Sequence, residues 1–399
     1  MHCRQIELKS GKTRWECVDD GPTKPSGKRN QIVRRGKTQK EAKAKVRDEI
    51  ARQTAGTNRK ISKRITFGDA AQKWYDVYSL DGKKKSTYRK RRREIRDLNE
   101  HLKDTPIMDI THDEYQSTIN KMFKKGHSQS TLLGTNSTAN MIFKYAKKNR
   151  WVEENPVTDV VIPKKRKTVE EIKQENIEET YFDRDELEEF LTATIKYGLK
   201  YDKERFFAMA FIGLRPGELC ALQKKDLLFE NDEIDINKTI YSETNSITGY
   251  ELTPPKTYGS IRVIPVERFI MDMLKKVVHD NDKHKMKYRK LIPDYHDKDF
   301  VFAHENGYPF LTITMRNRMR RILKKTNIKK NAYPHMFRHT HISMLTEAGV
   351  DLPTIMKLVG HENDKTTTKI YTHVTKKMIK DAPVHLRKMY GNILEKMLL

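Results

Sequence analysis

The stretch 333–374 of this 399-residue sequence holds the side chains best suited to chemistry, namely His335, Arg338, His361 and Tyr371. His335 and Arg338 are three positions apart, so a helix would present both on one face. Arginine binds phosphate oxygens, histidine exchanges protons near neutral pH, and a tyrosine hydroxyl can act as a nucleophile. Taken alone, each motif is weak, because a His-x-x-Arg pair occurs by chance in a chain rich in both residues and a tyrosine after a threonine run is usually a packed aromatic. Only the combination with upstream residues indicates a site.

Local signals place these residues on short helices. Pro334 favours a helix start just before the histidine, and Gly349 is typical of that helix's end. A second short helix is predicted over residues 353–359 and ends at a glycine. The threonines 366–368 then begin a further element, which carries Tyr371.

An arginine upstream occupies a position where charges are rare. Arg215 follows directly after a strongly apolar helix predicted for residues 206–214, and Pro216 begins the next helix. Such a position lies beside the core, where a charge needs a partner. A purely structural ion pair would explain the arginine equally well.

Between these motifs the sequence alternates short strands with helices. Strands are predicted at 234–236, 250–253, 261–266 and 300–303, helices at 267–278 and 312–325, and a charged loop at 279–298. Strands 250–253 and 261–266 enclose a turn sequence and are interpreted as a hairpin with Lys256 near its tip. Most hairpin lysines are simply solvated.

Taken in order, these motifs resemble the tyrosine recombinase family of the phage-integrase type. Residues 213–219 (GLRPGEL) resemble the family's first arginine box, and residues 335–340 (HMFRHT) its H-x-x-R box. Gly360-His361 followed by residues 370–373 (IYTH) resembles the closing signature. The resemblance spans residues 178–380, and the ten-residue step from His361 to Tyr371 is one longer than in some members.

The resemblance implies a role for each charged group at the cut phosphodiester. Arg215 and Arg338 would clamp the two non-bridging oxygens in the transition state, where extra negative charge develops. Lys256 would protonate the leaving 5′ alkoxide as general acid. Glu218, three positions after the first arginine, would support Arg215. No metal or other cofactor is implied.

The remaining roles concern the nucleophile. Tyr371 would attack phosphorus and form a 3′-phosphotyrosyl bond, which stores the energy of the broken linkage so that rejoining needs no ATP. His335 is the candidate proton acceptor from the tyrosine, and His361 could donate a hydrogen bond to a phosphate oxygen. No P-loop is present, because the Gly-Lys-Thr tripeptides at 11 and 36 lack the glycine that such a loop requires.

The charge balance favours a nucleic acid partner. The chain carries 80 Lys and Arg against 54 Asp and Glu, a net charge of +26. Residues 1–64 alone carry 19 basic against 7 acidic side chains, a net +12. An excess of this size favours binding to a nucleic acid backbone.

The residues before the motifs divide into two parts. Residues 1–64 predict strands at 4–8, 14–18 and 30–35 and a helix at 43–53, begun by a capping box of Thr38 and Glu41. Residues 65–160 predict four helices, one of them carrying eight basic residues among the eleven from Lys83 to Arg93.

The sequence therefore predicts a multidomain α+β protein. A three-stranded sheet with a helix (1–64) precedes an all-α domain (65–160) and a mainly α domain with a small antiparallel sheet (178–399). By resemblance these are an arm-type DNA-binding module, a core-binding domain and a catalytic domain. We expect a C-terminal amphipathic helix after Asp381 to dock on a neighbouring protomer.

The cysteines and the apolar runs bear on the compartment. Three cysteines (3, 17 and 220) without C-x-x-C spacing make a disulfide framework and a zinc ribbon improbable. The longest apolar run, 206–214, is far below the roughly 20 residues of a bilayer span, and we find no export signal. We expect a cytoplasmic protein without a membrane partner.

Two other classes of protein fit part of the sequence. A DNA-binding regulator or architectural protein would explain the charge and the domains but not the ordered motifs. A metal-dependent nuclease or transposase would need clustered carboxylates, which we do not find. The N-terminal module favours the integrase of a phage or other mobile element. The resemblance implies double-stranded DNA at core and arm-type sites, a tetramer on DNA, and an excisionase and a host DNA-bending protein as partners.

Overall fold

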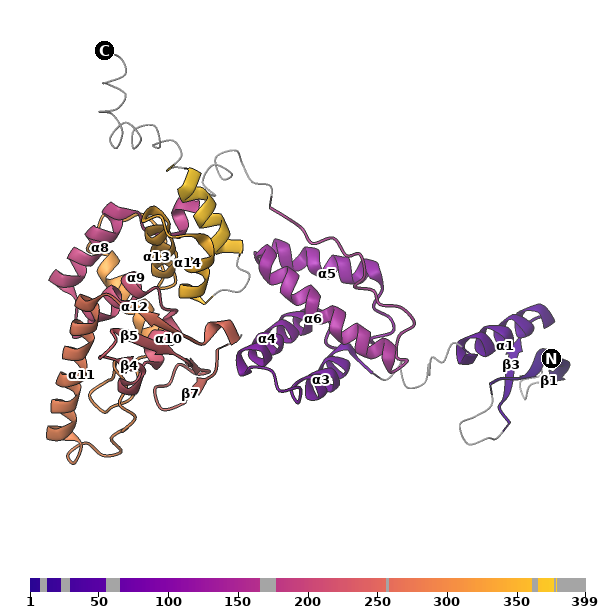
Figure 1. Ribbon diagram of the computed structural model, residues 1–399. Coiled ribbons are helices and arrows are strands. Elements are labelled where there is room, and N and C mark those ends of the chain that lie inside the picture. Colours follow the sequence, from indigo (N-terminus) through magenta and orange to yellow (C-terminus); the bar gives the residue numbers. More distant parts are fainter. Residues whose placement is uncertain are drawn as a thin grey trace, which may run out of the picture. The chain divides into compact units, whose positions relative to one another are not determined.

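The computed structural model describes residues 1–7, 13–22, 29–54, 65–165, 177–255, 258–360, 365–376 and 378. Contacts divide the chain into two units, Met1–Arg166 and Lys167–Leu399. Both α and β structure are present, as the sequence predicts, and Figure 1 labels the elements in chain order. The predicted C-terminal docking helix lies outside the described residues.

The N-terminal part is a three-stranded antiparallel sheet, in the order β1-β2-β3, with one helix on it (Figure 1). The bounds are β1 His2–Glu7, β2 Thr13–Asp20, β3 Gln31–Gly36 and α1 Gln39–Thr54. Its small core joins Cys17 and Ile32 of the sheet to Ala42 and Val46 of the helix. The hydroxyl of Thr38 accepts a hydrogen bond from the Glu41 N–H at 3.2 Å, which confirms the predicted helix start.

A disulfide joins Cys3 to Cys17, contrary to the expectation from the cysteine count. The two residues are direct cross-strand partners on β1 and β2, and Cys17 is fully buried. The spacing of cysteines along the chain does not reveal how two strands are aligned in a hairpin. Here the strand register brings two cysteines that are 14 positions apart side by side. Cys220 is a buried free thiol.

The sheet face opposite α1 carries an ion-pair triad. The register aligns Arg4 of β1, Glu16 of β2 and Arg35 of β3. Oε1 of Glu16 accepts from Arg4 Nη2 at 2.9 Å, and its Oε2 accepts from Arg35 Nε at 2.9 Å. Hydrogen bonds from the two guanidiniums lower the pKa of Glu16, so the carboxylate stays charged and holds both arginines on one face.

The next part is a bundle of four helices, as predicted. The bounds are α3 Phe67–Tyr78, α4 Lys85–Leu102, α5 His112–Lys124 and α6 Gln129–Lys148. Complete capping boxes at Thr66 and Thr111 begin α3 and α5. Fully buried Phe67, Tyr115 and Phe143 lie in its core. Six of the eight basic residues from 83 to 93 are exposed, in and just before α4.

The C-terminal unit is mainly helical and contains two small sheets (Figure 1). Its helices are α8 Arg184–Tyr197, α9 Asp202–Ile212, α10 Pro216–Ala221, α11 Arg268–Tyr288, α12 Thr312–Leu323, α13 Met336–Glu347, α14 Leu352–Val359 and the helical residues 365–376. Its strands are β4 Leu227–Leu228, β5 Glu233–Ile236 and β8 Arg262–Pro265 in one sheet, and β6 Thr239–Ser242 and β7 Tyr250–Thr253 in the other.

The predicted hairpin around Lys256 is wrong. Strand β7 pairs with β6, and β8 pairs with β5 in the other sheet, so β7 and β8 are not partners. The sequence reading missed β6, which begins only three residues after β5 ends, and so assigned β7 to the wrong partner. Lys256 itself lies outside the described residues.

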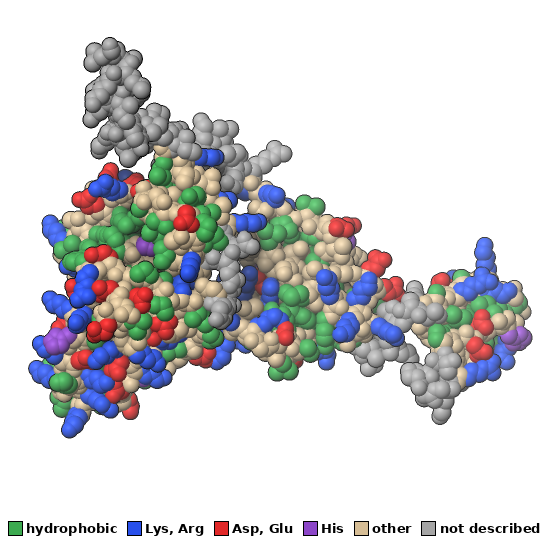
Figure 2. Space-filling view, in the orientation of Figure 1, with side chains coloured by type: hydrophobic (Ala, Val, Ile, Leu, Met, Phe, Trp, Pro, Cys, Tyr) green, Lys and Arg blue, Asp and Glu red, His purple; other side chains and the backbone are tan. Residues whose placement is uncertain are grey.

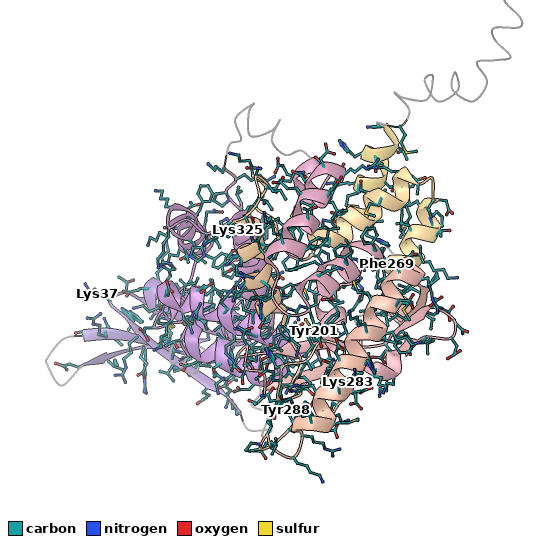
Figure 3. All side chains as sticks on the ribbon, turned by 90° about the vertical axis from the view of Figure 1, so that its left-hand side faces the viewer. Lys37, Tyr201, Phe269, Lys283, Tyr288 and Lys325 are labelled. Atoms are coloured by element: carbon teal, nitrogen blue, oxygen red, sulfur yellow. A yellow bond between two sulfur atoms is a disulfide. The ribbon has the colours of Figure 1, made fainter. Side chains whose placement is uncertain are left out.

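Two further elements differ from expectation. Helix α11 continues ten residues past Val278 to Tyr288, where a loop was predicted. None of residues 279–288 is buried, so this second half has helix-forming residues but no apolar stripe to reveal it. Figure 3 marks its two ends with Phe269 and Tyr288. Residues 300–303 form isolated bridges to Gln223 and Pro309 rather than a strand.

Aromatic packing sets the position of α13 in the core. Phe337 lies within 5.2 to 5.6 Å of the rings of Phe182, Phe190 and Phe206, measured between ring centroids. All four phenylalanines are almost completely buried. Because Phe337 is the neighbour of Arg338, this cluster also holds the H-x-x-R segment against α8 and α9.

Basic side chains are spread widely over the surface. Figure 2 shows lysine and arginine over the visible face of each part of the chain. None of the helices in the described ranges is long and apolar enough to cross a membrane.

Candidate active site

The turn between α9 and α10 presents Arg215, as the sequence predicts. Gly213 ends α9 with φ at 70°, and a Cβ there would lie 2.4 Å from Cδ2 of His341. Only glycine tolerates both the left-handed backbone and this close approach. Arg215 is then the N-cap of α10, and Pro216 is its first residue.

The carboxylate of Glu218 binds both the side chain and the backbone N–H of Arg215. Oε1 accepts from Arg215 Nη1 at 2.6 Å, and Oε2 accepts from the Arg215 backbone N–H at 3.0 Å. A second arginine, Arg262 of β8, donates from Nη2 to Oε2 at 3.1 Å. Burial alone would raise the pKa of Glu218, but Arg262 and Arg215 outweigh it and lower that pKa. The carboxylate is therefore charged at neutral pH.

Arg338 ties three elements together from inside the core. It lies in the first turn of α13 and has no exposed surface. Nη1 donates to the carbonyl of Gly213 at 2.9 Å, and Nη2 donates to the carbonyl of Val359. The H-x-x-R motif is thus joined to the end of α9, near Arg215, and to the end of α14.

The C-terminal end of α14 is where the arginines converge. The last carbonyls of a helix have no partner within it and favour cations. Here three successive carbonyls each accept from a different arginine. The pairs are Leu358 O with Arg262 Nε at 2.7 Å, Val359 O with Arg338 Nη2, and Gly360 O with Arg215 Nη2 at 3.0 Å. The structure therefore brings together Arg215, Glu218 and Arg338, as a single site requires.

His335 of the H-x-x-R motif is held in its neutral form. His335 is the N-cap of α13 and half-buried, and its pKa is lowered to about 4, first by burial and then by His339, Arg338 and Arg215. Its ring lies 5.1 Å from that of His339, whose Nδ1 bonds the Thr180 carbonyl. A neutral imidazole can accept a proton, as general base catalysis requires.

Tyr371 is half-buried on the helix of residues 365–376. Its neighbours Ile370 and Val374 are 1% exposed and pack with Ile342 of α13 and Ile355 of α14, and the tyrosine packs against this cluster. The tyrosine helix is therefore fixed to the same two helices that carry the arginine contacts. His361 directly follows Gly360 and, like Lys256, lies outside the described residues.

Arg262 is the residue that the sequence reading missed. A signal for it exists, because β8 alternates buried Arg262 and Ile264 with exposed Val263 and Pro265. A charged residue at a buried strand position needs a buried partner of opposite charge. No described group of three or more His, Cys, Asp or Glu side chains could hold a metal ion.

Comparisons with known proteins agree with this fold and motif order. Residues 180–378 match the phage integrase family, and residues 66–123 match the N-terminal SAM-like domain of phage integrases. The integrase of Staphylococcus phage L54a is 29% identical over 337 residues, covering 82% of this chain and 94% of the relative. The probable integrase of prophage ps2 of Lactococcus lactis subsp. lactis strain IL1403 is 30% identical over 348 residues, covering 86% and 87%.

Solved structures agree at the level of fold. The integrase of transposon Tn1549, in complex with a circular intermediate DNA, has a TM-score of 0.62 at 23% identity, covering 80% of this chain and 99% of that one. A lambda integrase tetramer bound to a Holliday junction has a TM-score of 0.55 at 16% identity, covering 92% and 94%.

The match to the phage integrase family and its curated relatives defines an enzyme that breaks and rejoins DNA strands. The chain belongs to the phage integrase family of tyrosine recombinases. It is a site-specific DNA recombinase of the mobile-element type, and a regulator without catalysis is not favoured.

Proposed function

We propose that this recombinase integrates and excises a mobile element through a 3′-phosphotyrosyl intermediate formed on Tyr371. The observation that carries the proposal is the convergence of Arg215 and Arg338 at the end of α14, beside the helix that bears the tyrosine. The sources of the two relatives, a phage and a prophage, support a mobile element.

The two arginines clamp the phosphate. Arg215 uses two of its five N–H donors on Glu218 and Gly360, and 29% of its side chain is exposed. Donors therefore remain for a phosphate oxygen. Arg338 has no exposed surface, so it reaches the other oxygen only after its neighbours shift on DNA binding. Both guanidiniums then bind the phosphate oxygens more strongly in the transition state than in the ground state, and this difference lowers the barrier.

Protons move at two places in the proposed reaction. His335, held neutral by its burial, accepts the proton of the Tyr371 hydroxyl as the Tyr Oη–P bond forms. Lys256 donates a proton to the departing 5′ oxygen as the P–O bond breaks, and His361 binds a phosphate oxygen. The 5′ hydroxyl of the partner strand reverses these steps at rejoining. Because the phosphotyrosyl bond conserves the bond energy, no nucleotide cofactor is needed, and the two arginines stabilise the transition-state charge without a metal.

The other parts of the chain hold DNA. The exposed basic residues in and before α4 bind backbone phosphates next to the cut, with residues 65–160 as the core-binding domain. The sheet of residues 1–64 binds arm-type sites away from the cut, through the face that carries Arg4 and Arg35. Four copies, with an excisionase and a host DNA-bending protein, assemble on DNA in the cytoplasm.

The test is covalent capture on a core-site duplex nicked just downstream of the cut. The short fragment that carries the new 5′ hydroxyl then dissociates, so the adduct cannot be rejoined and is trapped. Wild type is expected to give a protein–DNA band that survives denaturing electrophoresis. Tyr371→Phe should bind the duplex equally well and give no band, because only the nucleophilic oxygen is lost. Tyr333→Phe, at a 42% exposed tyrosine, is the matched control and should react normally. An adduct with Tyr371→Phe would assign the nucleophile to another tyrosine.

A further inference from the structure

We propose that Arg262 is a positioning residue for DNA cleavage, which orients Arg215 through Glu218 and holds the end of α14 in place. The inference rests on the proposed active site and adds a residue outside its motifs. Arg262 lies on β8, in a sheet separate from the strand that precedes Lys256.

The guanidinium of Arg262 is fully engaged with three segments. Nε donates to Leu358 O at 2.7 Å, Nη1 donates to Ser260 O at 3.0 Å, and Nη2 donates to Glu218 Oε2 at 3.1 Å. Only 9% of the residue is exposed, so these bonds lie in a setting of low dielectric where they are strong. A planar fork with donors on all three nitrogens is specific to arginine.

Each contact leads to a different part of the active site. Glu218 holds the side chain and the backbone of Arg215, so losing Arg262 would free the carboxylate to turn away from it. Leu358 O begins the carbonyl series that also binds Arg338 and Arg215 and ends at Gly360. Ser260 closes the short segment that follows Lys256 along the chain.

The glycine at the end of α14 leaves room for the guanidinium of Arg262. Gly360 has φ at 64°, and a Cβ there would lie 3.0 Å from Nη1 of Arg262 and 3.1 Å from the carbonyl oxygen of Gly259. The backbone carrying the Gly-His motif therefore approaches the arginine as closely as a glycine allows. Arg262 touches no reacting atom in this arrangement, and its role is to hold residues that do.

The experiment measures single-turnover adduct formation by the full-length chain on the nicked duplex. Arg262→Met is expected to lose about 100-fold in rate, the scale of a misplacement of about 1 Å, while DNA affinity stays unchanged. Arg262→Lys keeps the charge but cannot reach all three acceptors, so its rate should lie between wild type and Arg262→Met.

A purely structural role is separated by a matched control and a mutant cycle. Arg205 is 1% exposed and paired with Asp202 at 2.6 Å, away from the site, so Arg205→Met should lower the melting temperature without slowing adduct formation. Glu218→Gln combined with Arg262→Met should lose little more rate than either change alone, because the two act in series. Additive losses, or an equal loss with Arg205→Met, would overturn the inference.

Failure of the underlying site would look different. If wild type formed no adduct through Tyr371, or Arg215→Ala cleaved normally, the proposed active site would be wrong. If both behaved as expected while Arg262→Met and Arg262→Lys cleaved at the wild-type rate, Arg262 alone would be excluded. Should Arg262→Met not fold, the rate of Arg262→Lys decides by the same criterion.

Discussion

Replacing Arg215 by alanine is expected to slow DNA cleavage about 100-fold with little change in DNA affinity. The side chain is held at 2.6 Å from Glu218 Oε1 and 3.0 Å from Gly360 O before any substrate arrives. A preorganised donor of this kind contributes mainly when charge develops in the transition state. Its loss costs on the order of 3 kcal/mol, and each 1.36 kcal/mol is about a factor of ten in rate.

The same change should make the protein more sensitive to acid. Arg215 and Arg262 together lower the pKa of Glu218 below its ordinary value of 4.5, against the opposite effect of burial. The stability that a lowered carboxyl pKa contributes is present above the unfolded value and is lost as pH falls through the folded pKa. Without Arg215 the folded pKa rises, so the alanine variant should lose stability at a higher pH than wild type does. At neutral pH the lost partner should cost about 1 to 3 kcal/mol of unfolding free energy.

The assay combines three measurements on the full-length chain. Adduct formation under single turnover gives the rate, fluorescence anisotropy with labelled duplex gives the affinity, and thermal melts from pH 4 to pH 8 give the stability. Arg268→Ala is the control. Arg268 lies at the start of α11, its side chain is 62% exposed, and it pairs with Asp232. Equal losses of rate and affinity in Arg215→Ala would make it an ordinary phosphate contact and refute the clamp. If Arg268→Ala formed adducts as slowly as Arg215→Ala, the loss of rate would follow from the lower net charge and not from the clamp.

Three other perturbations test the remaining assignments. Lys256→Ala should abolish cleavage of normal DNA but cleave a substrate with a 5′-bridging sulfur, because a thiol of pKa about 8.5 leaves without a general acid; no rescue would exclude that role. Because the pKa of His335 is lowered from 6.5 to about 4, unfolding free energy should fall as pH drops through that window, and His335→Asn should flatten the fall in thermal melts. An unchanged slope would contradict a neutral buried ring. Deleting residues 1–64 should leave adducts on a short core duplex intact but abolish recombination of full-length sites, and lower the log–log salt slope by about 0.9 per lost phosphate contact. Normal recombination would contradict an arm-binding role.

Local signals in the sequence were sufficient for much of this protein. The helix start at Thr38 forms as predicted, and so does the helix start at Arg215-Pro216. These features depend on hydrogen bonds between residues three or four apart, which the sequence states directly. The motif order also identified the family, because a family signature is itself a pattern along the chain.

The tertiary structure alone decided which strands pair and what surrounds the arginines. Cys3 meets Cys17, and β7 pairs with β6 rather than β8, because strand register follows from packing over long distances and not from local periodicity. The bonds from Arg338 to Gly213 and from Arg215 to Gly360 join residues 125 and 145 positions apart. No local pattern contains such contacts. They form because the last carbonyls of α14 have no partner within the helix, and arginines from three other elements donate to them.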